Sequence, residues 1–142
     1  MNTTGVAVLD HSVQETNVWL RLVADQLHLD EDRHHAYIAL RAVLHALRDR
    51  LPPEVAVHLG AQLPTLVRGV YYEGWHMAGK PTKDHNVQEF ADHVLKELPP
   101  QFPMDPLTVA RGVFEVLWEK LDPGEFAKLM GHLPASLRTL RS

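Results

Sequence analysis

The chain has 142 residues, a formal net charge of −4 and a hydrophobic fraction of 45%, which is typical of one soluble globular domain and excludes a disordered chain. The absence of cysteine excludes disulfides, thiolate nucleophiles and cysteine-ligated metal centres. The acidic balance argues against nucleic-acid binding, and no apolar run reaches the roughly 20 residues that a membrane-spanning helix needs.

The N-terminal region predicts a leader and a first helix. Residues 1–11 show no sustained periodicity, so we expect a loose leader. They also lack the basic and apolar regions of a signal peptide, which predicts a cytoplasmic protein. From Ser12 to about His28 the apolar residues recur at the spacing of an amphipathic helix.

Acidic caps and prolines divide the rest of the chain into further helices. The predicted starts are Asp30, Pro53, Pro64, Asp84 or Asn86, Asp105-Pro106, Asp122 with Glu125 at capping-box spacing, and Pro134. The helix that begins at Pro64 is expected to continue to Trp75. Since no segment resembles a strand, we predict an all-α fold of about seven to eight helices, in a single domain that spans residues 1–142.

The chain also matches itself at an offset of 70 residues. Laying residues 38–72 on residues 108–142 gives nine identities in 35 positions without a gap. The identical pairs are mostly apolar or helix-starting residues, which predicts two tandem pseudo-repeats at about 12–76 and 85–142. Arg68 matches Arg138, and each could pair with a matched acid, Asp49 or Glu119, or remain solvated.

One segment has no counterpart in the second repeat, and it is the candidate interaction or ligand surface: Tyr71, Tyr72, Glu73, Trp75 and His76. Aromatic walls with a few polar groups are typical of ligand pockets, although the same residues can serve as core. On a continuous helix Tyr71 and Trp75 would share an inward face, with Tyr72 and His76 beside it.

The ten histidines raise the question of a metal site. Glu73 and His76 have an i,i+3 spacing that can place a carboxylate beside an imidazole, and His45, His93 or Asp25 could complete the ligand set from another helix. Solvated or capping histidines are the alternative. No other metal, nucleotide or catalytic motif is present, so we assign no catalytic residue and no cofactor.

Several short motifs carry a family resemblance: Leu63-Pro64, Arg68-Gly69, Tyr71-Tyr72, Gly74-Trp75, Pro81, Lys83 and Glu89-Phe90. With these motifs the chain resembles the bacterial domain-of-unknown-function family numbered 2267 over nearly its whole length. The resemblance implies an all-helical bacterial protein with no established activity. The chain departs from the family at His76-Met77-Ala78, where a polar or proline-containing segment is common.

Because the repeated features serve packing and none serves catalysis, we predict a non-enzymatic protein–protein interaction or regulatory module. Its partner would be another protein or a second copy of the chain in a homo-oligomer. Nucleic-acid binding is disfavoured and ranks as a third hypothesis, and no membrane association is expected. The alternative is a small-ligand or metal-binding protein that uses Tyr71–His76.

Overall fold

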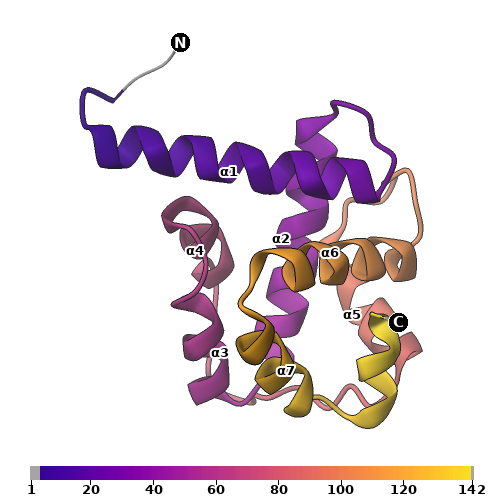
Figure 1. Ribbon diagram of the computed structural model, residues 1–142. Helices are drawn as coiled ribbons and strands as arrows, with labels where there is room; N and C mark the ends of the chain where they lie inside the picture. Colours follow the sequence, from indigo (N-terminus) through magenta and orange to yellow (C-terminus); the bar gives the residue numbers. More distant parts are fainter. Residues whose placement is uncertain (1–3, 142) are drawn as a thin grey trace.

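The computed structural model describes residues 4–141 and is built from helices alone (Figure 1). Seven α-helices and one 3-10 helix lie in this range, without a strand, which confirms the predicted fold class. Their bounds are α1 Ala7–Gln26, α2 Arg33–Arg50, α3 Pro53–Gly60, α4 Thr65–Tyr72, α5 Val87–Glu97, α6 Pro106–Lys120, α7 Pro123–Gly131 and the 3-10 helix η1 Ala135–Leu140.

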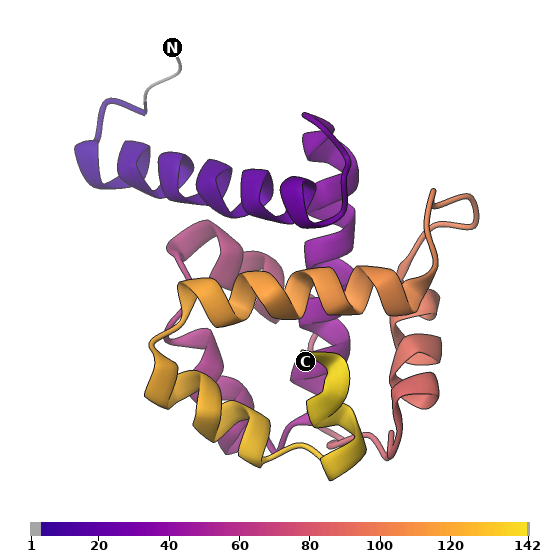
Figure 2. The same cartoon turned by 45° about the vertical axis from the view of Figure 1, so that its right-hand side comes forward.

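Helices α1, α2, α5 and α6 form the centre of the fold. Each of them contacts two neighbours in the order α1, α2, α5, α6 and back to α1, and α2 also contacts α6 directly. Figure 2 shows α1 and α6 lying across α2, with α5 at the far end of α6. The core is one apolar cluster to which every helix contributes, and the rings of Phe90 and Phe114 meet edge to face inside it. Helices α2 and α6 are therefore covered by other helices on most sides.

The chain becomes helical earlier than expected. Helix α1 begins at Ala7, so the prediction of a loose leader over residues 1–11 is wrong from that residue on, and residues 1–3 lie outside the described part. Local polar bonds explain the early start. The hydroxyl of Thr4 accepts from the Val6 amide, and the Asp10 carboxylate accepts from the Thr4 amide.

The start of α2 also differs from the prediction, by two residues. The N-cap is Asp32, whose carboxylate accepts from the amide of His35, and not Asp30. Asp30 instead takes a positive φ of 55° in the turn between α1 and α2. Asp and Asn tolerate this left-handed conformation better than most residues, so the same residue type that suits a cap also suits the turn before it.

The matched arginines have the same role in the two halves of the chain. The Arg68 guanidinium donates to the carbonyls of Gly60, Ala61 and Leu63. Arg138 donates to the carbonyls of the residues 70 positions later, which are Met130, Gly131 and Leu133. Each arginine thus satisfies the C-terminal carbonyls of the short helix before it. The predicted salt bridges to Asp49 and Glu119 are wrong, while the repeated geometry supports the predicted duplication.

The N-terminal half of α1 extends past α2 and α6 and lies over α4 (Figures 1 and 2). Its apolar side chains Val8, Leu9 and Val13 are exposed there, whereas Trp19 and Val23 in the second half are buried. Within residues 4–141 no helix is both long and apolar enough to span a membrane.

Replacing Gly60 tests the close contact between α3 and the last residue of α4, Tyr72. A Cβ at Gly60 would overlap the phenol ring of Tyr72, whereas a Cβ at Gly69 would meet nothing within 4 Å. We expect Gly60→Ala to lower the free energy of unfolding by about 1–3 kcal/mol through overpacking. The control Gly69→Ala lies in the exposed middle of α4 and should raise it by up to about 1 kcal/mol. Urea unfolding of both variants measures this, and equal stability of Gly60→Ala and wild type would contradict the contact.

Candidate functional site

The predicted aromatic segment divides between the core and the surface. Tyr71 is buried, its hydroxyl donates to the carbonyl of Ala56 at 2.6 Å, and burial raises the pKa of its phenol. Tyr72 and Trp75 are half-buried, and their rings stack with centroids 5.6 Å apart. His76 is exposed. Glu73 is exposed as well, so four of the five predicted surface residues are at least partly exposed, while Tyr71 belongs to the core.

Helix α4 ends before this segment does. It stops at Tyr72, and Gly74 takes a φ of +72°, which turns the chain away from the helix axis. The predicted helix through Trp75 is therefore wrong, and Tyr71 and Trp75 do not share a helical face. Because neither Glu73 nor His76 is helical, the i,i+3 pairing expected for them is also wrong.

Side chains of α2 hold the end of α4 in place. His45 donates from Nε2 to the carbonyl of Val70 at 2.7 Å. Arg48 donates from Nη1 to the carbonyls of Tyr71 at 2.8 Å and of Glu73 at 2.9 Å. The last carbonyls of a helix lack partners within the helix, and cationic side chains are favourable there. Two buried groups of α2 therefore determine where α4 ends.

The loop that follows, residues 73–86, is anchored at several points. The amide of Thr82 donates to the carbonyl of Asp49, and Nε of Arg50 donates to the carbonyl of Asp84. Both carboxylates of the loop have cationic partners, since Glu73 accepts from Arg41 and Asp84 from His93. Connections of this length without secondary structure are uncommon in compact domains and are usually functional or disordered. Because hydrogen bonds tie residues 73–86 to α2 and α5, this loop is ordered, which favours the functional alternative.

His93 on α5 stands between two carboxylates. Its Nδ1 lies 2.9 Å from Asp84, and its Nε2 lies 3.8 Å from Asp49, which also accepts from Nε of Arg48. Burial acts to lower the pKa of His93, but the hydrogen bonds and charges of Asp49 and Asp84 outweigh it and raise the pKa to about 9. Burial acts to raise the pKa of Asp49, and the hydrogen bonds from His93 and Arg48 hold it below its ordinary value.

Three of the residues predicted as metal-ligand candidates, Glu73, His45 and His93, have other partners. Glu73 faces Arg41, His45 bonds to Val70 and lies 3.3 Å from Glu97, and His93 lies between Asp84 and Asp49. Throughout residues 4–141, no three His, Asp or Glu side chains are arranged to hold a metal ion. The structure therefore does not bring Glu73 and His76 together with a third ligand.

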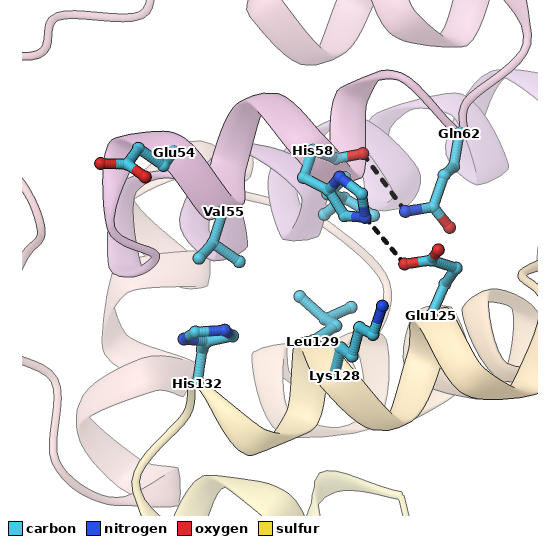
Figure 3. A pocket seen from close by; sticks show the side chains of 9 residues that line it. Glu54, Val55, His58, Gln62, Glu125, Lys128, Leu129 and His132 are labelled. Carbon is cyan, nitrogen blue, oxygen red and sulfur yellow. Dashed lines mark hydrogen bonds and ion pairs between the residues drawn. The ribbon is translucent and has the colours of Figure 1, made fainter.

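A groove on the other side of α3 was not predicted. It lies between α3 and α7, has a volume of about 340 Å³, and is shown in Figure 3. Val55, Leu59 and Leu129 give it an apolar surface. Its polar residues are Glu54, His58, Gln62, Glu125, Lys128 and His132. His58 donates to Glu125 at 2.8 Å and lowers the pKa of that carboxyl.

The self-match of the sequence contains a signal for this groove. Four pairs of its residues are related by the same offset of 70 positions: Val55 and Glu125, His58 and Lys128, Leu59 and Leu129, Gln62 and His132. Helices α3 and α7 therefore face each other with equivalent sides. Sequence reasoning missed the groove because the offset relates the two helices without showing that they are neighbours in space.

The fold and these surfaces define an all-α protein with an anchored aromatic loop and a groove between two short helices. A family model for the uncharacterised conserved proteins DUF2267 matches residues 16–140, and the chain belongs to this family. No curated protein matches the chain.

The contacts of His93 predict how stability depends on pH. Because its pKa is about 9 in the folded protein and about 6.5 when unfolded, its stabilising effect is complete below pH 6.5 and is lost as the pH rises through 9. Wild type should lose up to roughly 3 kcal/mol of unfolding free energy between pH 6.5 and 9.5. His93→Gln should be less stable than wild type at pH 6 and nearly flat over this interval. Urea unfolding at each pH measures both, and a wild-type curve as flat as the variant's would contradict the network.

Proposed function

We propose that this protein is a non-enzymatic interaction module that binds another protein through the aromatic surface, defined as Tyr72, Trp75, His76 and Met77. The observation that carries the proposal is the stacking of Tyr72, at the end of α4, on Trp75 in the anchored loop of residues 73–86, which also holds the exposed His76 and Met77. Met77 is 56% exposed in this loop. Tyr and Trp are enriched among the residues that dominate binding energy at protein interfaces.

The anchoring favours binding because little order has to be gained when a partner arrives. Tyr72 is held by its ring contact with Trp75 and by a 3.3 Å hydrogen bond to the carbonyl of Val57. Arg48 holds the backbone on both sides of Tyr72 through the carbonyls of Tyr71 and Glu73. Immobilising a free side chain at an interface costs about 0.5–1.5 kcal/mol, and a side chain that is already held avoids much of that cost.

The charge of the loop indicates what kind of partner fits. Its carboxylates, Glu73 and Asp84, pair with Arg41 and His93, each of which also lies near a second carboxylate. Lys80 and Lys83 form no ion pair among the described residues; the charge of Lys80 acts on Asp49, whereas Lys83 is exposed and presents its positive charge at the surface of the loop. The protein as a whole has a net charge of −4. The partner that complements this surface presents an apolar side chain beside carboxylates.

Site-specific crosslinking tests this function. A photo-crosslinking phenylalanine derivative in place of Met77, in the cells that make the protein, should capture one discrete partner, and the same group in place of Trp118 should not. Trp118 is 47% exposed and lies on α6, outside the aromatic surface. Titration calorimetry with the purified partner should then show binding weakened about tenfold or more by Trp75→Ser or Lys83→Glu.

The matched control is Trp118→Ser, which removes an exposed tryptophan elsewhere and should leave the affinity unchanged. Circular dichroism of each variant shows whether the fold is retained. Unchanged affinity of Trp75→Ser would overturn the assignment of this surface. A crosslink from position 77 to a second copy of the chain would replace the proposed partner by self-association.

A second candidate function, small-ligand binding, is supported by the groove between α3 and α7. Its volume of about 340 Å³ and its apolar surface edged by polar groups resemble those of small-molecule sites. The ligand would combine an apolar body with hydrogen-bonding groups that meet His58, Gln62 or His132. The sequence predicted small-ligand binding at Tyr71–His76. We propose the groove between α3 and α7 as its site instead.

Filling the groove tests this candidate. Val55→Trp should obstruct it, while Leu95→Trp, at an exposed position of α5, adds the same ring elsewhere. In a ligand-observed NMR screen of small fragments, binders of wild type should be lost with Val55→Trp and kept with Leu95→Trp. Fragments that bind all three proteins equally would contradict a site in this groove.

A further inference from the structure

A second groove, here called the α1 groove, lies beneath the overhanging N-terminal half of α1. Its other side is formed by the turn from α3 to α4 and by Lys120 at the end of α6. Its volume is about 470 Å³, which is within the range of small-molecule sites. The groove is distinct from the aromatic surface and from the groove between α3 and α7, although Gln62 lines both grooves.

Two buried polar groups belong to residues that line the α1 groove and have no hydrogen-bond partner in the described part of the chain. They are the indole Nε1 of Trp19, a residue only 2% exposed, and the hydroxyl of Ser12, a residue only 7% exposed. Leaving such a group without a partner destabilises the fold. The indole can only donate, so the partner that satisfies it is an acceptor.

The first turn of α4 adds further donors. Helix α4 starts at Thr65, after Pro64, and no side chain caps this end. The first amides of a helix point outward without partners and carry a partial positive charge. Both Pro64 and Thr65 line the α1 groove. An oxygen-rich anion is the ligand that these amides favour.

The charged side chains favour the same ligand. Arg68 uses Nε and Nη2 to bond the carbonyls at the end of α3, and its Nη1 has no partner among residues 4–141. No carboxylate in that range forms an ion pair with Lys120. One carboxylate, Glu15, also lines the groove, together with His11. The α1 groove therefore has two permanent positive charges, Arg68 and Lys120, and one negative charge, Glu15, in a protein whose net charge is −4.

We propose that the α1 groove binds a small anionic molecule with a phosphate or carboxylate group attached to an apolar body. The anionic group lies at the start of α4, between Arg68 and Lys120, and its oxygens satisfy Trp19 and Ser12. Val8, Leu63 and Pro64 supply apolar contacts for the rest of the ligand. The convergence of unsatisfied buried donors, an uncapped helix start and unpaired cations carries this assignment.

NMR titration with phenyl phosphate and with benzoate tests the proposal and distinguishes the two anionic groups. The indole Nε1–H resonance of Trp19 and the amides of Thr65 and Leu66 should shift and saturate with at least one of these probes. The three indole resonances are assigned with Trp75→Phe and Trp118→Phe. Benzylammonium, which has a similar ring and the opposite charge, should leave these resonances in place.

Two variants separate binding from folding. Ser12→Ala removes a buried hydroxyl that has no partner, so it should keep or raise the melting temperature while it weakens binding of the anion several-fold. Lys120→Gln should weaken binding about fivefold or more, and the control Lys96→Gln, at an exposed position of α5, should not. Absence of saturable shifts with both anions, equal shifts with benzylammonium, or unchanged affinity in Lys120→Gln would overturn the site.

Discussion

The buried guanidinium of Arg48 is the interaction on which the end of α4 and the loop of residues 73–86 depend. It lies on the most enclosed helix of the fold, and its donors meet the Asp49 carboxylate and two backbone carbonyls at the end of α4. A buried charge is tolerated only when its donors are satisfied, so the end of α4 and the cation stabilise each other. The direction of the following loop, the stacking of Tyr72 on Trp75 and the position of Thr82 beside Asp49 all follow from this arrangement.

Helix number and most helix boundaries could be predicted because their determinants are local. Asp105 caps α6 through the amide of Thr108, ahead of a proline in the first turn, and both features are visible as adjacent residues. The end of α4 could not be predicted in this way. Periodicity continues through Trp75, and the helix stops earlier because side chains more than 20 residues away take its carbonyls. Long-range capping has no sequence pattern of its own.

The candidate site was predicted as a stretch of chain but not as a surface. Sequence position identified Tyr72, Trp75 and His76, yet it could not separate them from Tyr71, which turns inward to Ala56. The two grooves could not be predicted from the sequence, because their walls come from helices that are distant along the chain. For Arg68 and Arg138 the self-match of the sequence correctly indicated equivalent roles, and the partners are backbone carbonyls and not the matched acids.

The sequence separations of these arginine contacts have a consequence for the order of folding. Every partner of Arg68 lies between five and eight residues away, and the same is true of Arg138. The backbone partners of Arg48 are 23 and 25 residues away. Closing a longer loop costs more conformational entropy before the contact is gained. We therefore expect the two short helical turns to assemble early and independently, and the aromatic loop to take its shape once α2 and α4 have docked.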